Sequence, residues 1–277
     1  MKLENISRRN IIKTGVAALA SGSIMNESAW ATPKAPGEVR VLFLIGDYWH
    51  NPVMQEHHWR RVLEPTKWRL LFAQSSQFVT PASLSEADLF VVCRYAGPDS
   101  LGWAPDRVIE DRPQSAPFMT DEQQDAIVKN VRNGMGLISV HCSVWNPERK
   151  EYMDLIGVEK PIMHTKVQPA HIHELNQNHP ITKGIGEFDT GDDEIFDAVL
   201  KPGQSTLLFK TSGDEQKVDA NGGWCRDEGK GRVVALLPGH IPSPYMKKEY
   251  REIMWRSAHW AMKKDIPSLS HIKEDGY

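Results

Sequence analysis

The feature that most constrains the fold of this chain is a short, uninterrupted apolar run, Val39–Ile45, that ends at Gly46. A strand that is apolar on both faces is typical of a parallel sheet covered by helices on both sides, because neither face meets water. Further strands are predicted at Trp68–Ala73, Asp88–Cys93, Gly136–Val140, Leu207–Lys210 and Arg232–Leu237.

Helical segments alternate with these strands. Pro52–Leu63 has helical character, and its proline suits a first turn. Thr120 and Gln123 have the spacing of a capping box, which opens a helix, and Tyr245–Met262 carries apolar residues at helical spacing. The alternation predicts an α/β fold with a doubly wound, mostly parallel open sheet of the flavodoxin-like type. The segment 166–197 has a weaker pattern, so shorter strands and loops are expected there.

Composition excludes several classes of protein. Of the 277 residues, 40% are hydrophobic and 25% are charged, which excludes a disordered chain or a disulfide-dense miniprotein. The net charge of −3 provides no general attraction to nucleic acid. No stretch reaches the roughly 18 apolar residues of a membrane-spanning helix. The cysteines are Cys93, Cys142 and Cys225, and we expect no obligatory disulfide among them.

The N-terminal residues follow the order of an export signal. Arg8 and Arg9 precede a weakly apolar segment, which is followed by Ala29-Trp30-Ala31. This order is that of a signal peptide, and the paired arginines resemble a twin-arginine signal, which carries folded proteins. With cleavage after Ala31, the mature protein is expected to be periplasmic or extracellular. The chain then divides into a signal peptide over residues 1–31, an α/β domain over 32–265 and a C-terminal tail over 266–277.

Histidines follow three of the predicted strands. His50 comes after the first strand, His141 directly follows the strand 136–140, and His240 follows the last strand. Ligands of open parallel sheets bind beyond the carboxyl ends of the strands, so these side chains are expected to meet at one edge. A single histidine there is more often structural, whereas three that converge indicate a functional site. The same strand ends also supply Asp47, Trp49 and Arg94.

Two further groups of polar residues stand out. Asp193 and Glu194 form either a solvated acidic loop or a part of the site. A group of four histidines is spread over sixteen residues: His164, His171, His173 and His179. His171 and His173 would share one face of a strand and could bind a metal, but no compact third ligand accompanies them. A divalent metal is therefore left open, and no other cofactor is expected.

An ordered set of segments runs through most of the chain: Gly46 with His50, Gly136–His141, His164, His179–Thr182, Asp193-Glu194, Gly229–Val233 and Pro238–His240. This set resembles the trehalose-utilisation (ThuA-like) family over about Val39 to Met262. The resemblance implies a fold like that of class I glutamine amidotransferases. In that fold a strand leads through a sharp turn to a nucleophilic cysteine, and a later strand delivers the partner histidine.

The chain departs from the amidotransferase pattern in several places. The turn after the strand 136–140 lacks the glycines of a nucleophile elbow. His141 takes the elbow position and Cys142 follows it, so Cys142 is expected to be a small buried residue rather than a nucleophile. His240 corresponds to the histidine of the last strand, but no glutamate stands two residues after it. Phe196 stands where the family usually has a tyrosine.

The resemblance implies a role in carbohydrate metabolism, with 3-keto sugars or keto-glycosides as substrates. A ketone acidifies the neighbouring C–H bonds, so a base can remove a proton while a histidine donates one or stabilises the enolate. Isomerisation of the sugar or elimination of the glycosidic oxygen can follow. The expected catalytic residues are His141, Glu194 and His240. The expected substrate-binding residues are Asp47, Trp49, His50, Arg94, His164, Asp193 and Trp224.

Two alternatives stay open at this point. A non-catalytic sugar-binding protein on the same scaffold needs aromatic rings but no acid–base set. A cysteine-dependent amidohydrolase or amidotransferase needs Cys142 on a strained turn beside His240. The expected partner is a small carbohydrate, without nucleic acid or a membrane span, and formation of a homo-oligomer is left open.

Overall fold

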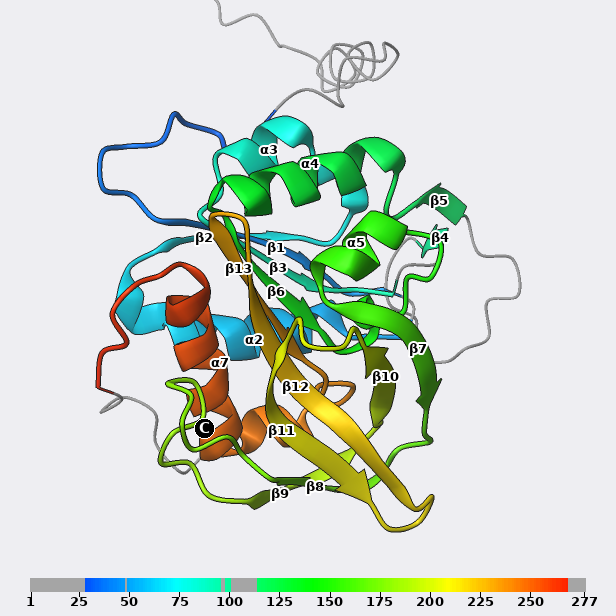
Figure 1. Cartoon of the computed structure of the whole chain (residues 1–277). Coiled ribbons are helices and arrows are strands. Elements are labelled where there is room, and N and C mark those ends of the chain that lie inside the picture. The colour runs from blue at the N-terminus through cyan, green and yellow to red at the C-terminus, as the bar shows by residue number, and fades with distance from the viewer. Residues whose placement is uncertain (1–27, 48, 96–97, 101–113, 269–277) are drawn as a thin grey trace, which may run out of the picture.

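The computed structural model describes residues 28–47, 49–95, 98–100 and 114–268. Within these ranges, nine strands form one sheet in the order β2-β1-β3-β6-β13-β12-β11-β8-β9 (Figure 1). Five neighbouring strands are parallel: β2 (Arg69–Ala73), β1 (Arg40–Ile45), β3 (Leu89–Cys93), β6 (Gly136–Val140) and β13 (Gly231–Leu236). The others pair antiparallel: β12 (Val218–Glu228), β11 (Thr206–Gly213), β8 (Gln168–His173) and β9 (Phe188–Asp193).

The parallel half of the sheet is built from the predicted apolar runs. Every residue of β1, β3 and β6 is buried. Alternate side chains of β1 enter opposite cores, with Leu42 and Leu44 on one face and Val41, Phe43 and Ile45 on the other. If the five parallel strands are numbered by their order along the chain, their order across the sheet is 2-1-3-4-5. This is the order of doubly wound flavodoxin-like sheets. The predicted fold class is confirmed.

Helices cover both faces of the parallel half (Figure 1). One face is covered by α2 (Pro52–Leu63) and α7 (Lys248–Ala261), and the other by α3 (Pro81–Ser85), α4 (Asp121–Asn133) and α5 (Lys150–Leu155). The predicted capping box opens α4, because Thr120 Oγ1 accepts a bond from the Gln123 amide at 3.2 Å and Gln123 Oε1 accepts one from the Thr120 amide at 3.0 Å. In the described part of the chain, no helix combines the length and apolar character needed to cross a membrane.

The antiparallel half contains the strands that the sequence pattern indicated least clearly. β8 and β9 fall within the segment 166–197, and only every second residue of β8 is buried. Such a strand has no continuous apolar run to reveal it. Next to this half, β7 (Val158–His164) pairs with β10 (Phe196–Leu200), with His164 opposite Phe196. A short antiparallel pair is formed by β4 (Pro98–Ser100) and β5 (Gln114–Pro117).

The predicted closing helix is interrupted. α6 (Ser243–Met246) and α7 are separated by Lys247, whose backbone is extended. The interruption lets two tyrosines reach one segment, since Tyr245 Oη donates to the carbonyl of Gly239 at 3.3 Å and Tyr250 Oη to that of Pro238 at 2.6 Å. In a continuous helix, residues five apart point in directions that differ by about 140°. The predicted closing helix is confirmed over α7, but its first residues form the separate helix α6, because the extended backbone of Lys247 breaks the helical path between them.

Trp30 anchors the segment that precedes β1. Its side chain is 5% exposed, its indole Nε1 donates to the carbonyl of Ser83 at 2.9 Å, and the guanidinium of Arg40 lies over its ring at 5.0 Å. Most of the predicted signal peptide (residues 1–27) and most of the predicted tail (residues 269–277) lie outside the described residues. Because Trp30 lies on the leader side of Ala31, cleavage after Ala31 would remove a core side chain from the domain.

We therefore expect a chain that begins at Thr32 to be less stable than one that begins at Ser28. Loss of a buried tryptophan is typically worth about 3 kcal/mol or more, which for a domain of this size lowers the melting temperature by about 5 to 10 °C. Thermal unfolding of the two purified chains checks this, and Trp30→Ala in the longer chain is expected to reproduce the loss. Equal melting temperatures of the two chains would contradict a stabilising role of Trp30.

α2 buries a histidine beside other cationic groups. His58 is 4% exposed, and its ring stacks on that of Tyr245 with centroids 5.0 Å apart. Burial, followed by the charges of His57, Arg61 and Arg251, lowers the pKa of His58 to about 4. The imidazole is therefore neutral in the folded protein at a pH where it is partly protonated in the unfolded chain.

This residue is expected to weaken the fold in mild acid. Between pH 6.5 and about 4, the unfolded chain binds a proton at His58 that the folded chain does not bind, so the free energy of unfolding falls as the pH falls through this window. The contribution is about 1 to 3 kcal/mol. Urea unfolding across the window should show a smaller loss for His58→Phe, which keeps the stacked ring, than for the wild type. Parallel losses in the two proteins would assign the acid sensitivity to other groups.

Candidate active site

A pocket of about 680 Å³ lies at the carboxyl ends of the parallel strands. It is lined by residues that follow β1, β3, β6 and β13, and by residues at or after the end of β7, after β9 and at the start of β10. Its polar wall consists of His50, His164, Thr165, Lys166, Glu194 and His240, and its aromatic wall of Trp49, Tyr95, Trp145 and Phe196, with Cys142 and Val167 beside them.

His50 is oriented by the turn that follows β1. Gly46 has φ +75°, a left-handed conformation that glycine adopts without strain. The next residue, Asp47, is buried, and its Oδ1 accepts bonds from the amides of Trp49 at 2.7 Å and His50 at 3.1 Å. Its two oxygens also accept from Nδ1 of His50 at 2.7 and 2.8 Å. Burial opposes ionisation of Asp47, but its interactions with His50 outweigh this and lower its pKa. Asp47 therefore orients His50 rather than contacting a ligand.

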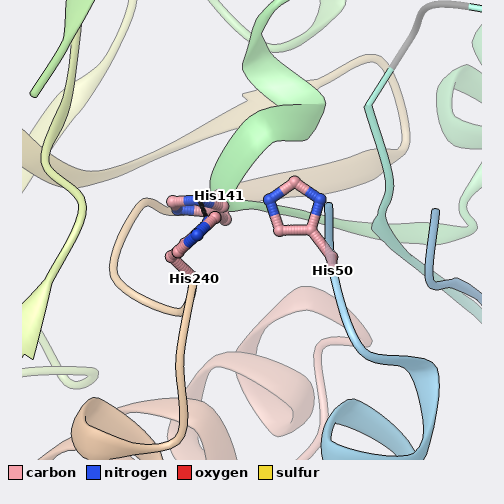
Figure 2. A group of neighbouring side chains, drawn as sticks. All are labelled: His50, His141 and His240. Atoms are coloured by element: carbon pink, nitrogen blue, oxygen red, sulfur yellow. Dashed lines mark hydrogen bonds between the residues drawn. The ribbon is translucent and has the colours of Figure 1, made fainter. Parts of the chain in front are cut away.

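His141 occupies a strained turn at the end of β6. Its φ of +51° lies in the left-handed region that residues with a Cβ rarely adopt, and it begins the 3₁₀ helix η5 (His141–Val144). The side chain is fully buried, and Nδ1 lies 2.8 Å from the carbonyl oxygen of Leu237. A carbonyl only accepts, so Nδ1 carries a proton and Nε2 faces the other way, 3.3 Å from Nδ1 of His240 (Figure 2). Burial lowers the pKa of His141.

Asp193 holds the loop that carries His240. Its carboxylate accepts bonds from the amides of Gly239 at 2.8 Å and His240 at 3.0 Å, at the end of β13. Burial raises the pKa of Asp193 to about 7, although these backbone bonds oppose the rise. For His240, burial and then the neighbouring His141 lower the pKa to about 4. Asp193 is 1% exposed and does not line the pocket, so its expected role in substrate binding is corrected to positioning of His240.

Glu194 contacts three histidines. Its Oε1 lies 2.8 Å from Nδ1 of His164, and its Oε2 lies 3.3 Å from Nε2 of His141 and 3.4 Å from Nδ1 of His240. The side chain is 14% exposed, at the wall of the pocket. Burial opposes ionisation, but the contact with His141 and the charges that His141, His240 and His164 carry when protonated hold the pKa of Glu194 at about 2. The acidic pair is therefore part of the site, not a solvated loop.

Two residues expected to bind substrate lie elsewhere. Trp224, on β12, is fully buried, and its Nε1 donates to the carbonyl of Ile156 at 2.7 Å. Arg94 is 1% exposed, and its Nη1 donates to the carbonyl of Gln74 at 2.8 Å. Neither lines the pocket. Both expectations were wrong because each side chain turns into the packed interior, where it has no surface to offer a ligand.

The sequence reasoning missed several residues of the pocket wall. Thr165, Lys166 and Val167 follow β7, in a region whose strand pattern is weak, so no sequence signal identified them. Tyr95 comes two residues after β3 and lines the pocket. The rule that ligands bind at strand ends would have identified it beside Arg94. Trp145, directly after η5, also lines the pocket. It was not missed, because its place beside a predicted loop had made it a candidate for packing against a sugar.

Comparisons with known proteins identify a sequence family that the chain matches and solved structures that resemble it. The sequence model of a family described as trehalose utilisation (ThuA) matches residues 40–261. A ThuA-like protein of Bacteroides uniformis has a similar structure, with a TM-score of 0.64 and 15% identity over 88% of this chain and 100% of that one. A ThuA-like protein of Parabacteroides merdae has a TM-score of 0.65 and 16% identity over 84% and 93%.

A β-galactosidase of Bacillus circulans shares the fold more distantly. Its TM-score is 0.53 at 9% identity, and the match covers 83% of this chain but 32% of that enzyme. No curated protein sequence matches the chain. At these identities the structural neighbours support the fold alone, and the relation to class I glutamine amidotransferases stays a prediction.

Cys142 lies beside the acid–base groups but is not exposed to react. Its side chain is 1% exposed, and Sγ lies 3.5 Å from Nδ1 of His50 and 3.9 Å from Asp47 Oδ2. Burial, and then the charge of Asp47, raises the pKa of the thiol well above its usual range. Only the thiolate is a strong nucleophile, so these surroundings disfavour thiol chemistry. Cys93 and Cys225 are likewise buried free thiols.

We expect iodoacetamide to leave Cys142 unmodified in the folded protein at neutral pH, because the sulfur is buried and protonated. The measurement is peptide mass spectrometry after timed alkylation, with the unfolded chain as the control in which all three cysteines react. Rapid and selective alkylation of Cys142 in the folded protein, with loss of function, would instead support the thiol mechanism.

Proposed function

The chain belongs to the trehalose-utilisation (ThuA) family, and we propose that it is an enzyme that acts on oxidised carbohydrates. In the proposed reaction, the enzyme removes a proton from the carbon beside the ketone of a 3-keto sugar or keto-glycoside. The observation that carries the proposal is the contact of one largely buried carboxylate, Glu194, with three histidines at the wall of a pocket.

Glu194 is ionised and faces the pocket, as a general base must, although the histidine contacts that hold its pKa at about 2 make it a weaker base than a free glutamate. Its carboxylate is largely shielded from bulk water. Its two oxygens have different neighbours, since His164 lies on the side of Oε1 and His141 and His240 on the side of Oε2. A proton accepted by one oxygen can therefore pass to an imidazole that is already within hydrogen-bonding distance.

The proposed step moves one proton and one electron pair. Glu194 takes the proton from C2, the C–H electron pair forms a C2=C3 double bond, and the ketone oxygen becomes an enolate oxygen. An imidazole N–H that donates to this oxygen stabilises the charge. Return of a proton to the enolate gives an isomer. Departure of the glycosidic oxygen from C1 with its electron pair, protonated by a histidine, restores the ketone and leaves a C1=C2 double bond and a free alcohol.

The remaining wall of the pocket suits a carbohydrate. The volume of about 680 Å³ lies within the range of about 300 to 1,000 Å³ that is usual for small-molecule sites. Trp49 is 43% exposed and Tyr95 is 38% exposed, so both rings offer flat apolar faces on which the C–H faces of a sugar can pack. Lys166 adds a hydrogen-bond donor for hydroxyl groups.

The acid–base groups favour an enzyme over a sugar-binding protein. Binding alone needs the aromatic wall but not a carboxylate that faces three imidazoles. The left-handed backbone of His141 supports the same conclusion, because such strain costs about 1 to 3 kcal/mol and is concentrated at functional sites. The buried, protonated thiol of Cys142 argues against the amidohydrolase alternative.

The proposal includes export of the protein. Its support is the order of Arg8 and Arg9, the weakly apolar segment and Ala29-Trp30-Ala31. Mass spectrometry of the protein from its native cell envelope would locate the mature N-terminus. A terminus at Thr32 fits the predicted site, whereas an unprocessed chain retained in the cytoplasm would contradict export.

Glu194→Gln is expected to lower kcat by about 10² to 10⁴ while it changes KM little, because the amide keeps the shape but cannot accept the proton. A panel of 3-keto-glycosides, with product identification by NMR, provides the assay. In heavy water, the wild type should introduce deuterium at the carbon beside the ketone, and the variant should not.

Glu187→Gln is the matched control, because Glu187 is an exposed glutamate that also lies near a histidine, His171, at 4.0 Å but outside the pocket. It should retain full activity. Full turnover by Glu194→Gln, together with no deuterium exchange in the wild type, would remove Glu194 as the base.

A further inference from the structure

Three imidazoles converge at the base of the pocket from three different strand ends (Figure 2). His50 follows β1, His141 follows β6 and His240 follows β13. One ring nitrogen of each lies within 4.8 Å of a ring nitrogen of each of the others. His50 and His141 are buried, and His240 is partly exposed towards the pocket. Such a cluster is unusual for packing, since three basic rings compete for the same few hydrogen-bond acceptors.

The protein presets the tautomers of two of these rings. Asp47 binds the Nδ1 proton of His50, and the carbonyl of Leu237 binds that of His141. In the neutral rings, each Nε2 therefore carries a lone pair, and that of His141 faces Glu194 and His240. The Nε2 of His50 is buried and has no hydrogen-bond partner among the described residues. A carboxylate or carbonyl behind each imidazole is the usual second shell of a metal-ligating histidine.

The spacing of the nitrogens fits a small cation. Zn²⁺–N bonds of about 2.0 to 2.1 Å in a tetrahedral site separate the ligand atoms by about 3.3 to 3.4 Å. Nε2 of His141 and Nδ1 of His240 are 3.3 Å apart. From these donors and distances we propose that His50, His141 and His240 bind one divalent transition-metal ion, with Zn²⁺ as the preferred occupant. Neutral imidazole donors favour Zn²⁺ over Mg²⁺ and Ca²⁺, which prefer oxygen.

Two other groups of side chains are weaker candidates for a metal site. Asp47, His50 and Cys142 are also close together, but Asp47 and Cys142 both lie on the Nδ1 side of His50, where Asp47 is already hydrogen-bonded. His171 and His173 stack with centroids 6.0 Å apart, and each is paired with an exposed aspartate. This pair of partly exposed histidines provides no third imidazole.

Three protein ligands leave a tetrahedral ion one open position, as in catalytic zinc sites. His50 and His240 both line the pocket, so an ion bound to them would be accessible to a substrate there. An ion there would accept the ketone oxygen of the sugar and stabilise the enolate beside Glu194, whose Oε2 lies 3.4 Å from His240. This role rests on the proposed function, whereas the binding of the ion does not.

The test is a metal titration without substrate. The purified protein is stripped with a chelator, dialysed, and titrated with Zn²⁺ and with Mg²⁺ by calorimetry, and thermal unfolding is recorded in parallel. We expect one equivalent of Zn²⁺ to bind and raise the melting temperature, with no binding of Mg²⁺ at the same concentrations. His50→Gln and His240→Gln should each weaken Zn²⁺ binding at least 100-fold. Asp47→Asn, which changes only the group behind His50, should weaken it about 10- to 100-fold.

His171→Gln is the matched control and should bind Zn²⁺ as the wild type does. Circular dichroism of each metal-free variant verifies that it is folded. If the variant at the buried His50 does not fold, Zn²⁺ binding by His240→Gln decides the result. Retained Zn²⁺ binding in His240→Gln, or loss of binding in His171→Gln alone, would overturn the proposal. Because the readout is metal affinity, a failed sugar assay leaves this result intact, and a failed titration leaves the Glu194 experiment intact.

Discussion

The hydrogen bond between Nδ1 of His141 and the carbonyl of Leu237, at 2.8 Å, is the interaction on which the site depends. It joins the ends of β6 and β13, the adjacent strands in the middle of the sheet. The bond lies in a fully buried setting, where a hydrogen bond is strong and an unpaired ring nitrogen is costly. It determines which nitrogen of His141 carries the proton, and it thereby directs the other nitrogen towards Glu194 and His240.

A second interaction connects the far edge of the sheet to the same place. β9 is the last strand of the antiparallel half, yet the carboxylate of Asp193 at its end binds the amides of Gly239 and His240 beyond β13. Successive side chains of an extended segment point in opposite directions. Asp193 can therefore hold the His240 loop while the next residue, Glu194, contacts the histidines. One residue of the acidic pair holds the His240 loop, and the other lines the pocket.

Much of this arrangement could be predicted from local patterns. The continuous apolar runs identified the parallel strands, and the capping box at Thr120 identified the start of α4, because both signals depend on neighbouring residues alone. Since parallel strands share one carboxyl edge, the same runs predicted that His50, His141 and His240 would meet. Lys166 was missed because it follows a strand without a continuous apolar pattern, and Trp224 was misplaced because local sequence does not tell which loop or strand tryptophans are buried.

The sequence by itself determined the fold class, the edge of the sheet where the pocket lies and several of its polar residues, because hydrophobic periodicity and the alternation of strands and helices are read locally along the chain. Only the tertiary structure decided which atoms meet. The distances between Glu194 and its three histidines, the left-handed turn at His141 and the paths of Trp224 and Arg94 into the interior depend on how the two halves of the sheet pack. Packing of the two halves sets these distances, and hydrogen bonding and proton transfer at the site depend on them.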